Sequence, residues 1–373
     1  MTRHYLDHAS TSPVRPEAVD AMVGWLRSPA ADPSRSHAEG LRARAAVEEA
    51  REQVAALVGA RSREVVFTSG ATEAIAAAVW GASERGRHVV VPAVEHSAVR
   101  EASARAGEVT VVGVDRTGRV DAGEVLAAVR PDTALVHVQW GNHEVGTVQP
   151  VAEVVAGCRE RGVLVHVDAA QAVGHVPVAF DDLGADLLSL SGHKLGGPPG
   201  VGALLVRRGL RLRPLLVGGD QERARRAGLE NVPAVAGLGA AAEAVAGRLD
   251  AEAAEAGRLT GRVAAAAAGM DGGVVVYGHP DHRLPHVVCL GLAGVEPQPV
   301  LIGLDRAGIA VHSGNSCSSE ALEPSPVLAA MGVDAARSLR VSVGWSTTDA
   351  DVDAFLAALP PILADLRALA RQA

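Results

Sequence analysis

The pattern of apolar and polar positions predicts a chain of alternating strands and helices. Residues 41–58 space their apolar positions as a helix does, and Gly59 is a suitable place for that helix to end. A short apolar strand is expected at 64–68, followed by small residues and an alanine-rich helix to about Ala82. Further strands are expected at 88–92, 109–114, 133–138, 163–167, 186–190 and 202–206, with helices at 97–106, 122–129 and 151–161. Strands separated by helices of this length indicate βαβ units and a mostly parallel sheet.

The last third of the chain has a different, mixed pattern. A long helical stretch at 232–268 with a break near Gly247 predicts a bridge to a second, smaller domain. Beyond it we expect strands at 274–277, 286–292 and 338–343, a helix near 300–306 and a closing amphipathic helix from 349 to about 371. The predicted division is a large domain at 14–245 and a small domain formed by 1–13 and 246–373.

Composition narrows the class of protein. At 373 residues, with 48% hydrophobic and 21% charged residues, the chain has the make-up of a globular enzyme. The net charge of -8 argues against a nucleic-acid or anionic membrane surface, and charges or Gly/Pro interrupt every apolar run before it reaches the length of a membrane span. The N-terminus lacks the form of a signal peptide, so a cytoplasmic location is expected. Three cysteines are too few and too scattered for a disulfide framework or a metal site.

Polar residues gather where the predicted strands end. In mostly parallel sheets, ligands bind beyond the carboxyl ends of the strands. The residues at those ends are Ser69 to Thr72, Glu95, His96, Asn142 to Glu144, Asp168, Gln171 and Ser191 to Lys194. The small-residue turn before the helix at 71–82 would also offer free backbone N–H groups, which suit a phosphate.

Lys194 is the only lysine in the chain, against 34 arginines. Arginine can replace lysine wherever only a positive charge is needed, but it cannot lose its proton and attack a carbonyl. A single retained lysine therefore points to amine chemistry, with Schiff-base formation as the leading candidate. The alternative is a surface lysine retained by chance.

Three further strand-end residues could hold a pyridine ring. Asp168 follows an apolar strand and would need a partner if buried, such as the ring N–H of pyridoxal phosphate; it could instead cap a turn. Gln171 could donate to a phenolic oxygen or be solvated. His96 could stack on a flat ring or be a satisfied core histidine.

Cys317 and Arg340 are the remaining candidates. Cys317 lies in a run of small polar residues, about 312–322, where a thiol would be accessible; it could also be a spare surface thiol. Cys158 and Cys289 lie in a predicted helix and a predicted apolar strand and look like small core residues. Arg340 interrupts a strand pattern, so it could bind a substrate carboxylate or form an internal salt bridge.

At this point the ordered motifs resemble those of a known family, the pyridoxal-phosphate cysteine desulfurases of the iron–sulfur assembly type, in the class V aminotransferase group. The resemblance covers nearly the whole chain. Its motifs are YLDHASTSPV at 5–14, SRSH at 34–37, VVFTSGATE at 65–73, EH at 95–96, NHEVGTVQP at 142–150, HVDAAQAVG at 166–174, SGHKLGGPPGVGAL at 191–204, GGDQE at 218–222, the Cys317 loop, LEPSPVL at 322–328 and SLRVSVG at 338–344.

The resemblance implies an α/β protein of pyridoxal-phosphate fold type I, with helices on both faces of the central sheet and a smaller α+β domain that carries the cysteine loop. It implies Lys194 as the Schiff-base lysine, Asp168 as the partner of the ring nitrogen, Gln171 at the phenolic oxygen and His96 as the stacking residue. Phosphate-binding positions correspond to Ala71, Thr72, Ser191 and His193. Arg340 corresponds to the residue that grips the substrate carboxylate, and Cys317 to the persulfide-forming cysteine.

Two positions depart from the family pattern. His143 stands where the family usually has Asn, at a position that contacts cofactor or substrate, and imidazole is bulkier and titratable. Leu229 stands where the family usually has a Thr that reaches the partner subunit's phosphate, and Leu cannot donate a hydrogen bond.

The implied activity is conversion of L-cysteine to L-alanine with a persulfide on Cys317, in a homodimer that passes sulfur to an acceptor protein. That acceptor could belong to iron–sulfur assembly, tRNA thiolation, a DNA-sulfur pathway or a natural-product pathway. The alternatives are another class V enzyme, such as a cysteine or selenocysteine lyase or a small-molecule aminotransferase, and a non-catalytic relative acting as a partner protein.

Overall fold

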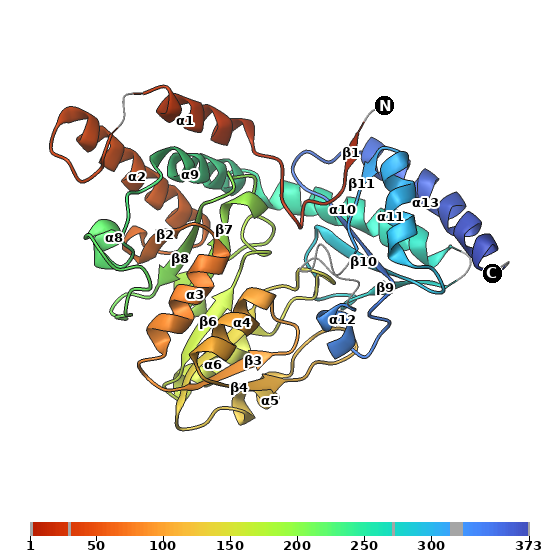
Figure 1. Cartoon of the computed structure of the whole chain (residues 1–373), viewed down its shortest axis with the longest axis horizontal. Coiled ribbons are helices and arrows are strands. Elements are labelled where there is room, and N and C mark those ends of the chain that lie inside the picture. Colours follow the sequence, from red (N-terminus) through yellow and green to blue (C-terminus); the bar gives the residue numbers. More distant parts are fainter. Residues whose placement is uncertain (1–2, 29–30, 271–272, 314–323, 372–373) are drawn as a thin grey trace.

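The computed structural model describes residues 3–28, 31–270, 273–313 and 324–371 (Figure 1). A seven-stranded sheet forms the larger part, in the order β2-β8-β7-β6-β5-β3-β4. Only β8 pairs antiparallel with its neighbours, so the predicted mostly parallel sheet is confirmed. Its strands are β2 (Val65–Thr68), β3 (His88–Pro92), β4 (Glu108–Val112), β5 (Thr133–Gln139), β6 (Leu164–Asp168), β7 (Leu187–Ser191) and β8 (Gly202–Val206).

Helices cover both faces of this sheet, as expected. Side chains alternate between faces along each strand, so Val65 joins one core while Val66 joins the other. The first face packs against α2 (Ala38–Leu57), α5 (Ala122–Ala127), α6 (Val151–Glu160) and α9 (Val232–Ala246). The second face packs against α3 (Ala71–Ala82) and α4 (Ser97–Ala106). Because both faces are buried, the strands other than the partly exposed edge strand β4 contain nearly continuous apolar runs.

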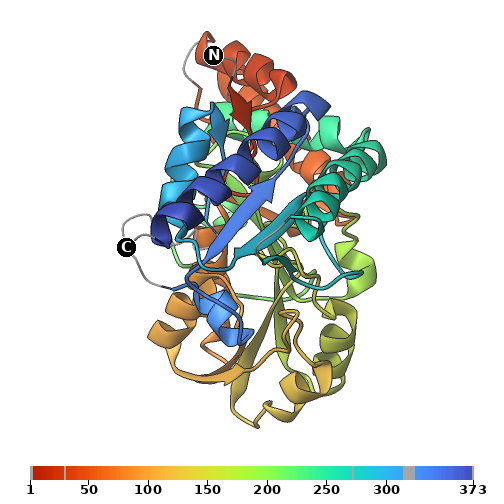
Figure 2. The same ribbon diagram turned by 90° about the vertical axis from the view of Figure 1, so that its right-hand side faces the viewer.

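A smaller antiparallel sheet, in the order β12-β10-β9, has its own core. Its strands are β9 (Val274–Tyr277), β10 (Val287–Leu292) and β12 (Ser338–Ser342). It packs with α10 (Leu249–Ala268), α11 (Pro297–Arg306) and α13 (Asp349–Ala370), and α11 and α13 lie side by side (Figure 2). Leu6 from the N-terminal segment is buried in the same core. The predicted domain boundaries stay a prediction.

The main differences from the predicted elements come from short or weakly patterned segments. Helix α1 (Pro16–Leu26) was not predicted, because only Ala18 of it is fully buried and its apolar face is correspondingly weak. Strands β1 (His4–Tyr5) and β11 (Ile309–Ala310) pair with each other across most of the chain, and two residues carry no readable period. The short helices α7 (Phe180–Leu183), α8 (Gln221–Ala224) and α12 (Pro326–Ala330) were also missed. The predicted break near Gly247 is a 77° bend between α9 and α10.

Within the described part of the chain, no helix taken singly has the length and apolar character needed to cross a membrane. Only the bent pair α9 and α10 reaches that length and composition, and it does so when the two helices are counted together.

Candidate active site

A cavity of about 460 Å³ lies beyond the carboxyl ends of the central strands. Every predicted site residue that the structure describes lines it: Ala71, Thr72, His96, His143, Asp168, Gln171, Ser191, His193, Lys194 and Arg340. The N-terminal segment contributes Ala9 and Ser10 to the same wall. Cys317 lies outside the described residues. The fold thus brings Ser10 and Arg340, which are 330 positions apart in sequence, to one cavity.

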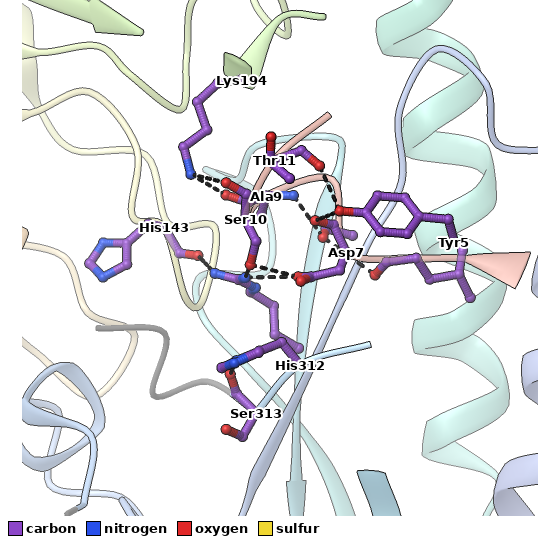
Figure 3. Close-up of polar contacts among 12 residues, drawn as sticks. Tyr5, Asp7, Ala9, Ser10, Thr11, His143, Lys194, His312 and Ser313 are labelled. Atoms are coloured by element: carbon purple, nitrogen blue, oxygen red, sulfur yellow. Dashed lines mark hydrogen bonds and ion pairs between the residues drawn. The ribbon is translucent and has the colours of Figure 1, made fainter. Parts of the chain in front are cut away.

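Lys194 reaches this cavity from the end of β7. The strand ends at Ser191, and a single turn (Gly192–Lys194) follows it. The Nζ of Lys194 donates to the carbonyl oxygens of Ala9 at 2.5 Å and Ser10 at 2.8 Å (Figure 3). Lys194 is therefore a partly buried cavity residue, and the alternative of a chance surface lysine is wrong.

Asp168 is the last residue of β6 and is 8% exposed. Its Oδ1 accepts the N–H of Ala170 at 3.0 Å and the hydroxyl of Ser189 at 3.3 Å. Asp168 therefore caps the following turn, as the second of its two predicted roles requires. It also lines the cavity. The two functions are compatible, because a carboxylate has several acceptor positions.

Glu95 is a second buried carboxyl group close to Asp168. One oxygen, Oε1, accepts the N–H of Gln139 at 2.5 Å, while Oε2 has no hydrogen-bond partner among the described residues. Burial first, and the charge of Asp168 second, raise the pKa of Glu95 to about 8. Glu95 therefore keeps its proton at neutral pH, beside the carboxyl group of Asp168. The strand-end rule found Glu95, but it assigned no role to it.

Gln171 is buried three residues beyond Asp168, at 6% exposure, so the solvated alternative is wrong. Its Nε2 donates to the Ala9 carbonyl at 2.9 Å, and its Oε1 lies 3.2 Å from His286 Nε2. The Ala9 carbonyl thus accepts from both Gln171 and Lys194. The sequence pattern did not indicate His286 or this backbone oxygen.

His96 and His143 lie edge to face, with ring centroids 5.1 Å apart and an interplanar angle of 68°. His96 precedes α4, and its Nδ1 accepts the N–H of Ala98 at 3.1 Å, which caps that helix. This bond fixes the imidazole at the helix N-terminus while the residue lines the cavity. His143, which stands where the family usually has Asn, therefore packs directly against His96, the predicted stacking residue.

The part of the cavity wall formed by the start of α3 suits a phosphate group. Ser69 to Thr72 form the turn into the twelve-residue helix α3, whose first N–H groups and dipole favour an anion. Gly202 allows the close approach of β8, because a Cβ there would lie 2.7 Å from Gly70 Cα. Burial, followed by the nearby charge of Lys194, lowers the pKa of His193 to about 4, so its imidazole is neutral.

Arg340 is 1% exposed and lies on β12 of the small sheet. It donates to the His143 carbonyl at 2.8 Å, to the Ser10 hydroxyl at 2.6 Å and to the Asp7 carboxylate at 3.0 Å. Arg340 therefore forms an internal salt bridge with Asp7, which was one of the two roles predicted for it. The Nε of Arg340 has no partner among the described residues, so the guanidinium retains donor capacity beside the cavity.

The two described cysteines are buried, as expected. Cys158 lies in α6 and Cys289 in β10, and both are fully buried and free. Burial raises the pKa of the Cys158 thiol to about 11 and also raises that of Cys289. Both thiols are therefore protonated at neutral pH, which disfavours them as nucleophiles.

Comparisons with known proteins agree with this geometry. The family model of the class-V aminotransferases matches residues 4–355. Cysteine desulfurase IscS of Dictyoglomus turgidum is 40% identical over 98% of this chain and 95% of its own length. A cysteine desulfurase of Gluconacetobacter diazotrophicus is 42% identical over the same shares. The solved structure of a NifS-like protein superposes with a TM-score of 0.92 at 32% identity, covering 98% of this chain and all of its own.

The site has the parts that pyridoxal phosphate needs: an amine, a buried carboxylate, an amide donor and a helix N-terminus around one cavity. Family, fold and site therefore agree. The chain belongs to the class-V aminotransferases, as a pyridoxal-phosphate-dependent cysteine desulfurase of fold type I.

Proposed function

We propose that the residues around Lys194 convert L-cysteine to L-alanine and that the sulfur leaves as a persulfide on Cys317. The observation that carries the proposal is the single cavity shared by Lys194, Asp168, Gln171 and Arg340. These side chains supply an amine, an anion, a neutral donor and a cation. Together they match the parts of a phosphorylated pyridine cofactor and an amino-acid substrate.

The cofactor would be held at several points. Asp168 would keep a proton on the ring nitrogen, and the Gln171 amide would donate to the phenolic oxygen. His96 would lie against the ring, while Ala71, Thr72, Ser191 and His193 would surround the phosphate at the start of α3. When bound, pyridoxal phosphate supplies an electron-withdrawing ring that stabilises negative charge at the substrate Cα.

Lys194 and Arg340 would handle the amino acid. Arg340 would bind the substrate carboxylate, which then competes with Asp7 for a donor that is already buried and directed. The Lys194 amine would remove the Cα proton. The Ala9 and Ser10 carbonyls accept from this amine and direct it along the cavity wall.

Cys317 would take the sulfur. Its thiolate attacks the sulfur of the substrate, a sulfur–sulfur bond forms, and the carbon–sulfur bond breaks. The electron pair of that bond stays with carbon, which is protonated to give the methyl group of L-alanine. The sum is L-cysteine plus one thiol giving L-alanine plus one persulfide. An acceptor protein then removes the terminal sulfur, and a reductant releases it as sulfide.

A homodimer is part of the proposal. Two adjacent apolar residues on the segment that follows β8 are exposed, Leu216 with an exposed fraction of 41% and Val217 with 79%. Leu229, farther along the chain, is 62% exposed. A second copy of the chain is the occupant that we propose for this surface. Sedimentation should give a dimer, and Val217→Asp should shift it toward monomer. A monomeric parent would contradict this assignment.

We also propose a cytoplasmic location, because a persulfide-forming thiol requires a reducing compartment. Cell fractionation with an antibody to the chain tests this; recovery with the exported fraction would contradict it.

Product analysis tests the proposed reaction. The loaded enzyme is incubated with L-cysteine and a thiol reductant, and alanine, sulfide, pyruvate and ammonia are measured. We expect alanine and sulfide in equal amounts. Pyruvate and ammonia would indicate a β-lyase instead, and Cys317→Ala should lose most of the sulfide release while keeping bound cofactor.

A further inference from the structure

His286, immediately before β10, contacts Gln171 from the side of the protein interior. The residue is fully buried, and its Nε2 lies 3.2 Å from Gln171 Oε1. Gln171 already uses its Nε2 to donate to the Ala9 carbonyl. Since Oε1 can only accept, His286 must carry a proton on Nε2 and donate it. Its Nδ1 has no hydrogen-bond partner among the described residues, as fits the bare nitrogen of a neutral ring.

A second imidazole fixes the plane of this ring. His175 stacks on His286 with ring centroids 3.6 Å apart and an interplanar angle of 14°. Its Nε2 lies 3.2 Å from the Lys194 carbonyl oxygen, to which it donates. The two rings therefore connect the backbone of Lys194 to the amide of Gln171 through one stack and two hydrogen bonds.

The surroundings keep His286 neutral. The titratable or charged groups that face it are His175, His8, Lys194 and Arg340, and none of them is an anion. Burial, reinforced by these groups, lowers the pKa of His286 well below its ordinary value. A neutral ring with its proton on Nε2 is a donor, so it offers Gln171 the same hydrogen bond at neutral and alkaline pH.

We infer that His286 is a positioning residue that holds the Gln171 amide in one orientation, with its second N–H available to the cavity. The inference rests on the role proposed above for Gln171. An amide has nearly the same shape after a half-turn, so only its hydrogen bonds decide which end faces a ligand. Without the His286 donor, the Ala9 carbonyl alone would oppose a half-turn of the amide. After such a turn the amide oxygen would face the phenolic oxygen of the cofactor, and two acceptors would repel each other.

The visible absorption of the loaded enzyme, titrated with pH, tests the inference. His286→Phe keeps a flat ring for the stack and removes the N–H. We expect the pH midpoint of the absorption change to rise by about one unit, because the ionised phenolic oxygen loses a donor and holds a neighbouring proton more tightly. The matched control, His175→Phe, keeps the stack and removes only the bond to the Lys194 carbonyl. Its midpoint should stay at the parental value.

A double-mutant comparison shows whether His286 acts through Gln171. Gln171→Leu should raise the midpoint, and adding His286→Phe should then change nothing further. If Gln171→Leu raises the midpoint but His286→Phe does not, or if the two effects add in full, the inference is overturned. If Gln171→Leu itself leaves the midpoint in place, the role proposed for Gln171 fails instead.

A second pair of variants covers the case in which the Phe variant does not fold or load. His286→Asn can donate an N–H to Gln171, whereas His286→Leu cannot. The midpoint of the Asn variant should lie nearer the parental value, and its cofactor dissociation constant should be the lower of the two. Equal values for the two variants overturn the inference.

Discussion

Glu95 gives the clearest quantitative prediction, because it is a buried carboxyl group whose Oε2 has no partner among the described residues. Its pKa is raised from 4.5 to about 8, mainly by burial and then by Asp168. Below pH 4.5 the group is protonated in both the folded and the unfolded chain. Between about 4.5 and 8 the folded protein keeps a proton that the unfolded chain has released. The free energy of unfolding therefore falls as the pH rises through this window.

The size of the effect follows from the same values. Each pH unit inside the window costs about 1.4 kcal/mol, so the interval from pH 5.5 to 7.5 removes about 2.7 kcal/mol. For a chain of this length that is a decrease of about 3–4 °C in melting temperature. Glu95→Gln keeps an oxygen to accept the Gln139 N–H and removes the titration. We expect it to abolish this part of the pH dependence.

Thermal melting of the loaded enzyme at pH 5.5, 6.5 and 7.5 measures the slope. Glu101→Gln is the matched control, because Glu101 is exposed on the adjacent helix α4 and should leave the slope unchanged. The reasoning is refuted if the parent and Glu95→Gln lose stability equally over this interval. That result would mean that Glu95 is ionised in the folded protein.

Three further substitutions, the last with a matched control, test other parts of the account. Lys194→Arg keeps a cation but not the amine chemistry, so alanine formation should fall by a factor of about 10³ or more, and the absorption spectrum should show no covalently attached cofactor. Arg340→Gln should raise the KM for L-cysteine about 10- to 100-fold, through the loss of a charge-assisted bond to the substrate carboxylate, and unchanged steady-state kinetics would contradict that role. Glu222→Gln breaks a pair with Arg51 in which both residues are at most 5% exposed, and urea titration should show a loss of about 3–5 kcal/mol. Glu48→Gln removes the exposed carboxylate of the same arginine and should cost no more than about 1 kcal/mol.

The site residues at strand ends could be predicted from sequence because a parallel sheet places the carboxyl ends of its strands at one edge. Asp168 and Lys194 follow apolar runs at β6 and β7, and adjacent parallel strands bring their carboxyl ends to one edge. The same reasoning placed His96 at the end of β3, before α4. Local pattern and one general rule were sufficient for these positions.

Other parts of the site could not be predicted, because they depend on contacts between distant segments. The carbonyls of Ala9 and Ser10 hold Lys194 from about 185 positions away, and a backbone oxygen leaves no mark in the sequence. His286 is one apolar-flanked histidine among several, and only the fold places it on Gln171. The sequence indicated that Arg340 needs an anion, but it did not indicate which one. The fold places the carboxylate of Asp7 beside it.

The central claim is that sulfur passes from L-cysteine, activated in the Lys194 cavity, to Cys317. Mass spectrometry of the loaded enzyme after L-cysteine without reductant tests it directly. We predict one added sulfur atom, on the peptide that contains Cys317, with Cys158 and Cys289 unmodified because both are buried and protonated. Cys317→Ala should show no added sulfur. Sulfur on another cysteine, or parental alanine formation by Cys317→Ala, would contradict the account.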